Sequence, residues 1–402
     1  MQRTPHSQEQ TDIVFQILQI TKSLRELKSL DSILDRLLLE ARRLVGADAG
    51  TIFLVEGSDI VFSYVHNDSL FSAAEVNRHV YLDARLPIDG TSLAGYVART
   101  GKVMVIEDAY AIDPSLPVTF NVSFDERTGY RTRAVAALPL VSSQGRTVAV
   151  IQLLNPTSPA GDPVTFDESH IGCLSLLADQ AAAAVEVGLV TEQFILRMSR
   201  MAELRDPGET ASHVRRVGAY CAEIYHTIVG RGDLPERELK RRKDMMRIAA
   251  MLHDVGKVGI SDKILGKPGR LTAEEYQVMQ QHTVLGAGLF DPPSSEMDAW
   301  ARDVALHHHQ RYDGNGYPVT AEAPSGCGSL AGEGIPLAAR ITSVADVYDA
   351  LVSKRVYKPP MLHEEACDIL RRDSGSSFDP TVLEAFFSIQ DVVLAIRSKY
   401  AE

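Results

Sequence analysis

The chain has 402 residues, more than one ordinary hydrophobic core accommodates, so two or three domains are expected. With 45% hydrophobic and 23% charged residues, its composition is that of a globular protein. The net charge of −12 argues against DNA as a partner, because sequence-independent binding of nucleic acid needs a basic surface.

Two further observations set the expected compartment. The N-terminus is polar, unlike a secretory signal peptide, and we find no apolar run of about 18 residues, so no membrane association is expected. The four cysteines are scattered and never spaced as CxxC, which favours reduced thiols over disulfides. We therefore expect a cytoplasmic protein.

Residues 1–30 are expected to form an amphipathic helix. Its apolar residues step by four and three, as in the a and d positions of a coiled coil: Ile13, Ile17, Ile20, Leu24 and Leu27. We favour a seam that joins two chains into a homodimer, which the long helical segment near residues 170–205 would also help to hold. The alternative is a stripe that packs on its own domain.

Residues 31–185 show the order helix, strands, helix. Residues 30–46 are amphipathic and end at a glycine, and the Val- and Ile-rich segments that follow are typical of strands. A long helical pattern over residues 168–206 then connects this region to the next. AGTIFLVE and residues 90–109, GTSLAGYVARTGKVMVIEDA, resemble a GAF domain. That resemblance implies an α/β sensor domain with a central antiparallel sheet and a small ligand of unknown identity.

One departure bears on that ligand. Cyclic-nucleotide-binding GAF domains carry Asn-Lys, then Phe, then Asp-Glu, whereas here Pro156 follows Asn155 and Phe166 runs directly into Asp167. The resemblance therefore does not support nucleotide binding by this domain.

Residues 200–400 are helical in pattern, and they hold histidines and acids in apolar surroundings. Glu209 and His213 are four residues apart on one helix face, and His253-Asp254 ends an apolar helix. His282, the run His307–His309 and Asp346 follow. Each alone is more simply a capping, surface or ion-paired residue. Together they favour a site for iron, manganese, zinc or nickel, in which a carboxylate and imidazoles hold two ions.

The same region resembles an HD-GYP domain, the phosphodiesterase branch of the HD superfamily. The matching segments are HDVGKVGISDKILGKPGRL (253–271), HHQRYDGNGYP (308–318), IPLAARITSVADVYDAL (335–351) and SKRVYK (353–358). The fold expected for the whole chain is thus multidomain α+β: a GAF-like domain, a long linker helix and an all-α HD-GYP bundle.

The resemblance implies a role for each matching residue. The metal ligands would be His213, His253, Asp254, His282, His308, His309 and Asp346, with Glu209 as the ligand of a third ion. Asp254, as the bridging carboxylate, and Lys257 would be catalytic, and Lys257, Tyr317, Arg355 and Lys358 would contact substrate. Two or three divalent ions, iron or else manganese, would support hydrolysis of cyclic di-GMP to pGpG, with a second cut to GMP possible, regulated by the GAF domain.

Two departures and two alternatives accompany this reading. Gln310 stands where the family usually has Glu, and residues 319–334 are longer than the usual link, either as a flap or as an exposed loop. The first alternative function is a catalytically silent sensor of cyclic dinucleotides. The second is a phosphodiesterase for another substrate, such as the mixed guanine-adenine cyclic dinucleotide.

Overall fold

The computed structural model describes residues 5–27, 29–67, 85–203, 210–319, 330–353 and 360–400. It divides into two compact units, Met1–Val190 and Thr191–Glu402, and each is described by itself below. The predicted residues Glu209, Arg355 and Lys358, and most of the predicted insertion, lie outside the described residues.

The first unit opens with two helices, α1 (Pro5–Glu26) and α2 (Leu30–Val45). The Ser29 side chain accepts from the Ser32 amide at the start of α2, and Gly46 ends it at a φ of 62°, which glycine adopts without steric cost.

The apolar stripe of α1 is buried within the chain itself. Ile17, Ile20 and Leu24 are at most 5% exposed, and α1 contacts α2. The preferred prediction, that this stripe is the seam of a dimer, is therefore wrong, and the alternative of packing on its own domain is right. A period of 3.5 residues predicts which side chains are buried, but it does not predict whether they pack on their own chain or on a second copy.

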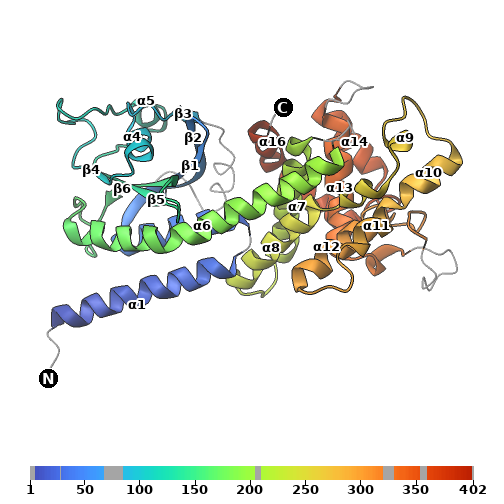
Figure 1. Ribbon diagram of the computed structural model, residues 1–402, viewed down its shortest axis with the longest axis horizontal. Coiled ribbons are helices and arrows are strands. Elements are labelled where there is room, and N and C mark those ends of the chain that lie inside the picture. The colour runs from blue at the N-terminus through green and yellow to red at the C-terminus, as the bar shows by residue number, and fades with distance from the viewer. Residues whose placement is uncertain are drawn as a thin grey trace. The chain divides into compact units, whose positions relative to one another are not determined.

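Six antiparallel strands form the sheet of this unit in the order β3-β2-β1-β6-β5-β4. They are β1 (Ala47–Glu56), β2 (Asp59–Asn67), β3 (Arg85–Pro87), β4 (Met104–Ile106), β5 (Val135–Val141) and β6 (Thr147–Pro156). Helix α4 (Leu93–Thr100) packs on one face of the sheet (Figure 1). Helix α2 packs on β1, β2 and β6 from the other face. The short helix α5 (Ser123–Thr128) lies in the connection between β4 and β5. The expected GAF-like α/β domain with an antiparallel sheet is confirmed.

The side chain of Asn155 stabilises the loop that precedes β5. Its Nδ2 donates to the Tyr130 hydroxyl at 3.0 Å and to the Arg131 carbonyl at 2.8 Å, and its Oδ1 accepts from the Arg133 amide. The side-chain amide therefore holds the loop before β5 and is occupied by the protein's own groups.

The long helix α6 (Glu168–Glu203) follows the sheet and continues into the second unit (Figure 1). Within Glu168–Met198, an 18-residue window has a mean hydropathy of 1.5, so this helix is long and apolar enough, by length and composition alone, to cross a membrane, which the search for an uninterrupted apolar run did not identify. One face of α6, including Leu177, Ala181 and Val185, is buried in the structure. A core helix passes the same test, and 44% of the window is buried.

The second unit is helical throughout the residues that the structure describes. Its elements are α7 (Ala211–Val229), α8 (Glu236–Met251), η1 (Val255–Gly259), α9 (Asp262–Leu265), α10 (Ala273–Gln280), α11 (His282–Gly288), α12 (Glu296–His307), η2 (Gly332–Gly334), α13 (Leu337–Val352), α14 (His363–Arg372), α15 (Pro380–Ser388) and α16 (Gln390–Lys399). Helix α7 packs on α8 and α13, and α11 packs on α12 and η1. The expected all-α bundle is confirmed.

Candidate metal centre

Three helices bring the first group of ligand atoms together. His213 lies in the first turn of α7, His253 follows α8, and Asp346 lies within α13. The Asp346 Oδ1 is 3.7 Å from His213 Nε2 and 3.9 Å from His253 Nε2. One ligand atom from each of the three lies within 4.8 Å of the others.

A second group lies directly beside the first. Asp254, His282, His308 and His309 also place one ligand atom each within 4.8 Å of the others. His282 begins α11, whereas His308 and His309 follow the end of α12. The seven predicted ligands that the structure describes therefore converge on one place, although they are spread over more than 130 positions of the sequence.

Asp254 connects the two groups. One carboxylate oxygen lies 3.1 Å from His253 Nε2, and the other lies 3.1 Å from His282 Nε2 and 3.6 Å from His308 Nε2. A carboxylate with one oxygen toward each group is the arrangement in which a single side chain bridges two ions.

The backbone fixes which ring nitrogen of the histidines faces the centre. The Nδ1 atoms of His253, His282 and His308 lie 2.7–3.1 Å from carbonyl oxygens of the preceding helical turns. A carbonyl only accepts, so each Nδ1 carries the proton, and the Nε2 of each neutral imidazole presents a lone pair to the centre.

Two of these lone pairs face each other, since His282 Nε2 and His308 Nε2 are 3.4 Å apart. With both Nδ1 atoms protonated, no hydrogen bond can join the two neutral rings, and a cation is what makes this approach favourable. The donor set, imidazole and carboxylate without thiolate, fits a divalent transition metal.

The pKa shifts of the ligand side chains agree with binding of a divalent metal. Burial raises the pKa of Asp254, but the adjacent Lys257 ammonium outweighs burial and holds that pKa well below its usual value. Burial lowers the pKa of His308 and, more strongly, that of His309. An ionised carboxylate among neutral imidazoles is the state in which these side chains bind metal.

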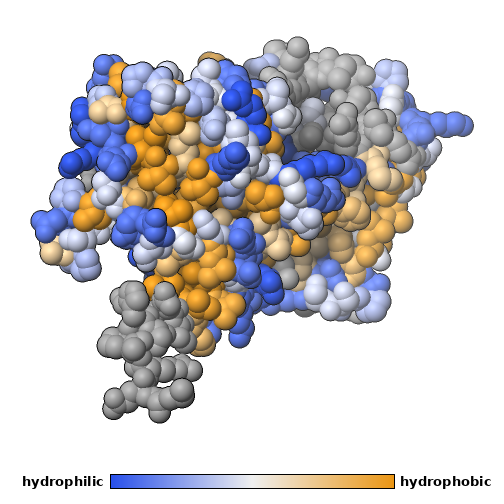
Figure 2. Space-filling view, turned by 60° about the vertical axis from the view of Figure 1, so that its left-hand side comes forward, coloured by the Kyte–Doolittle hydropathy of each residue, from blue (hydrophilic) through white to orange (hydrophobic). Residues whose placement is uncertain are grey.

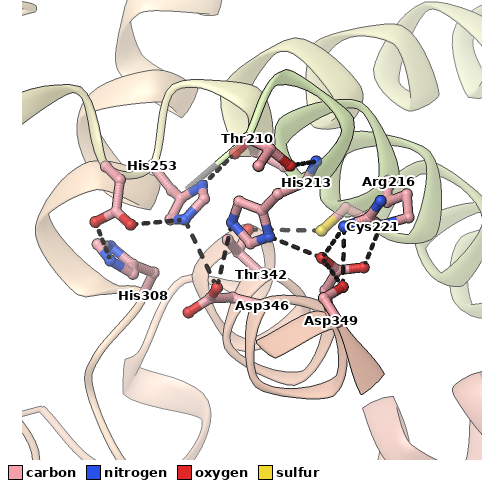
Figure 3. Close-up of polar contacts among 12 residues, drawn as sticks. Thr210, His213, Arg216, Cys221, His253, His308, Thr342, Asp346 and Asp349 are labelled. Atoms are coloured by element: carbon pink, nitrogen blue, oxygen red, sulfur yellow. Dashed lines mark hydrogen bonds and ion pairs between the residues drawn. The ribbon is translucent and has the colours of Figure 1, made fainter. Parts of the chain in front are cut away.

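A further carboxylate, which the sequence did not lead us to predict, contacts the Nδ1 of His213. Asp349 is fully buried and accepts from His213 Nδ1 at 2.8 Å, while Arg216 donates to both Asp349 oxygens at 2.7 and 2.9 Å (Figure 3). Burial raises the pKa of Asp349, but the bonds from His213 and Arg216 bring it to about 2. Asp349 follows Asp346 by three residues on α13, and this spacing was the available signal.

Two predicted substrate-contacting residues border the centre. The Lys257 Nζ lies 3.0 Å from Asp254 Oδ2, so its ammonium reaches the bridging carboxylate. The Tyr317 ring lies 4.7 Å from the His309 ring, centroid to centroid. Gln310 holds the same loop, because its Nε2 donates to the Pro318 carbonyl at 2.7 Å. A glutamate there would lack this donor.

The extra histidine of the predicted run is not part of either group. His307 ends α12 and is 9% exposed, and burial lowers its pKa.

Comparison with known families agrees with this division of the chain. A model of the GAF domain matches residues 29–185, and a model of the HD domain matches residues 197–382. Among solved structures, the GAF domain of a phosphoenolpyruvate-protein phosphotransferase from Coxiella burnetii is similar at 16% identity, with a TM-score of 0.36, and covers 46% of this chain and 98% of that one.

Several curated proteins are similar in sequence. A cyclic di-GMP phosphodiesterase of Vibrio cholerae is 35% identical over 247 residues, covering 59% of this chain and 48% of its own. One of Thermotoga maritima is 37% identical over 193 residues, covering 48% of each. The 3'3'-cGAMP-specific phosphodiesterase 2 of Vibrio cholerae is 36% identical over 231 residues, covering 58% of this chain and 41% of its own.

This chain thus spans about half the length of the curated relatives that it matches. HD domains bind divalent metal through histidine and aspartate side chains of the kind that converge here. The chain thus carries a region that matches the GAF domain at residues 29–185, followed by a region that matches the HD domain at residues 197–382.

Proposed function

We propose that the chain is a metal-dependent phosphodiesterase that hydrolyses cyclic di-GMP to pGpG and then to GMP. The observation that carries this proposal is the position of Asp254 between two groups of ligands. Bound between those groups, two divalent ions would activate water at neutral pH and stabilise both oxygens of an in-line displacement at phosphorus.

The side chains around the centre supply the rest. The Lys257 ammonium, 3.0 Å from Asp254, is placed to neutralise charge that develops on a phosphate at the centre. We assign the same role to Arg355 and Lys358, in the segment SKRVYK. Neither Lys257 nor the ligand set requires a covalent intermediate with the protein.

The direct test is turnover of cyclic di-GMP, with product analysis, by metal-replete wild type, Asp254→Ala and Lys257→Ala. We expect no turnover in Asp254→Ala, because both groups lose their shared ligand. Lys257→Ala should retain metal and lose roughly 10²–10³-fold in rate, the usual effect of removing one electrostatic contact to the transition state. Full activity in Asp254→Ala would exclude this centre as the site of the reaction.

The second candidate substrate is the mixed guanine-adenine cyclic dinucleotide. It is favoured by one relative, named a 3'3'-cGAMP-specific phosphodiesterase and 36% identical to this chain. Comparing kcat/KM for the two dinucleotides decides between them. Tight binding without turnover of either would instead support the silent sensor.

We propose iron as the metal, with manganese as the alternative, because carboxylate and imidazole ligands suit both ions. We also propose that Glu209 holds a third ion, since it lies four residues before His213 in the sequence. Metal analysis of protein purified without chelators tests this: three ions in the wild type and two in Glu209→Ala support it, whereas equal counts contradict it.

We propose that the GAF domain binds a small ligand and regulates the HD domain through α6, which continues from one unit into the other. A cytoplasmic location is also proposed, supported by the cysteines within the described residues, which are all free: Cys173, Cys221 and Cys367. Cell fractionation tests the location.

A further inference from the structure

Beside the metal centre, an exposed tyrosine extends the aromatic contacts of the loop after α12. The Tyr276 ring of α10 meets the Tyr317 ring edge to face, with centroids 6.1 Å apart and an interplanar angle of 80°. Tyr317 in turn lies against His309 and, at 6.3 Å, against His282. Tyr276 is 47% exposed, so part of its ring remains open next to the site where phosphate is expected.

The helix that carries Tyr276 is firmly anchored. Thr272 caps α10 by accepting from the Glu275 amide, and Glu275 accepts in return from the Thr272 amide at 2.8 Å. Glu275 also pairs with Lys267 Nζ at 2.5 Å. A capping box at the residue before Tyr276 fixes the backbone from which its ring projects.

The loop beneath Tyr317 is equally constrained. The Tyr317 amide donates to the His309 carbonyl, and a Cβ at Gly316 would lie 2.4 Å from the same oxygen, so only glycine fits there. Together with the Gln310 bond to Pro318, these contacts fix Tyr317 in place. The two tyrosines therefore need little ordering when a ligand binds, which lowers the entropic cost of contact.

We infer that Tyr276 is a specificity-determining residue whose open ring stacks on a purine base of the substrate. This inference rests on the proposed function and adds the part of the substrate that lies beyond the phosphate. Every nucleobase has a π-face, and a half-exposed aromatic ring beside a phosphate site provides the surface that such a face needs.

A purely supporting role makes a different prediction. If Tyr276 only held Tyr317 in place, its removal would disturb the centre for every phosphodiester. If its ring binds a base, the loss is confined to substrates that carry one.

The experiment compares Tyr276→Ala, Tyr276→Phe and wild type on two substrates, cyclic di-GMP and methyl p-nitrophenyl phosphate, which has no base. We expect KM for cyclic di-GMP to rise about 5- to 140-fold in Tyr276→Ala, equivalent to roughly 1–3 kcal/mol of base stacking. Tyr276→Phe keeps the ring and should stay near wild type, and kinetics with the base-free diester should stay unchanged in both variants.

Val278→Ala is the matched control, because Val278 lies on the same helix, about 200° around the axis, and is 44% exposed. Equal losses on both substrates, or an unchanged KM for cyclic di-GMP in Tyr276→Ala, would overturn the inference while leaving the phosphodiesterase intact. A wild type that hydrolyses neither substrate would instead overturn the proposed function, and this inference with it.

Discussion

Asp349 orients the predicted metal ligand His213 by accepting a hydrogen bond from its Nδ1. This contribution can be measured separately from catalysis. The His213 Nδ1–H donates to Asp349, which leaves Nε2 to face Asp346 and the centre. Ligands held in this way by a carboxylate typically lose 10–100-fold in metal affinity when that carboxylate is altered.

We therefore expect Asp349→Asn to weaken metal binding by about 10–100-fold, while the helical circular dichroism spectrum is retained. Asn keeps the shape but loses the charge that stabilises His213 as a ligand. Ser353→Ala is the control, because Ser353 also donates to Asp349 but carries no charge and is not among the predicted metal ligands. Metal affinity is measured by competition with a chromophoric chelator. Equal affinities in all three proteins would mean that Asp349 serves only the buried ion pair with Arg216.

At the level of single residues, the sequence alone predicted the metal ligands but not the buried residues that orient them. Histidines and acids in apolar helices stand out, because burying them is costly unless something satisfies them. Asp349 and Arg216 are also buried charges, but they form an ion pair with each other. A charge that is paired within the protein has no distinctive sequence pattern beyond its spacing.

The approach of η1 to α11 depends on a single glycine of the HDVGK segment. A Cβ on Gly256 would lie 1.9 Å from the His282 carbonyl oxygen and 2.4 Å from the Gly286 amide nitrogen. Real Cβ atoms essentially never come this close to backbone, so an alanine there must push η1 and α11 apart. Asp254, which immediately precedes η1, and His282, which begins α11, would then separate.

We predict that Gly256→Ala lowers both metal content and turnover, with loss of stability from overpacking of about 1–3 kcal/mol. Gly288→Ala is the matched control, since a Cβ there meets nothing within 4 Å and alanine favours the helix. Denaturant unfolding and metal analysis of both variants test this. If Gly256→Ala retains full metal content, the close contact is not what places the ligands.

For helices and strands, the sequence predicted where an element begins and ends better than it predicted which surface the element packs against. The boundary of α2 follows from Ser29 and Gly46, whose capping roles are local. The burial of Ile17 and Leu24 within the chain could not be predicted in this way, because the surface that covers them is formed by residues distant in sequence.

The N-terminal stripe is used within the chain, so a dimer requires another surface, and α6 offers one. Val187, Val190 and Phe194 are each more than 60% exposed and follow the spacing of a coiled-coil seam. Figure 2 shows hydrophobic side chains gathered on the face turned toward the viewer. We propose that α6 pairs with α6 of a second copy.

The double variant Val190→Glu/Phe194→Glu should then be monomeric by light scattering while the wild type is dimeric, because two carboxylates in an apolar seam repel their counterparts. Val103→Glu places the same charge on an exposed hydrophobic residue outside α6 and should leave the dimer intact. Dimers of the double variant would locate the interface elsewhere.

For the whole molecule, we predict that hydrolysis depends on divalent metal held by the ligands that Asp254 connects. The decisive measurement is turnover of cyclic di-GMP by protein stripped of metal with a chelator and then titrated with Fe²⁺ or Mn²⁺ under anaerobic conditions. We predict no turnover in the stripped protein, and recovery that saturates at two or more ions per chain in the wild type but not in Asp254→Ala. Undiminished turnover by the stripped protein would contradict the account.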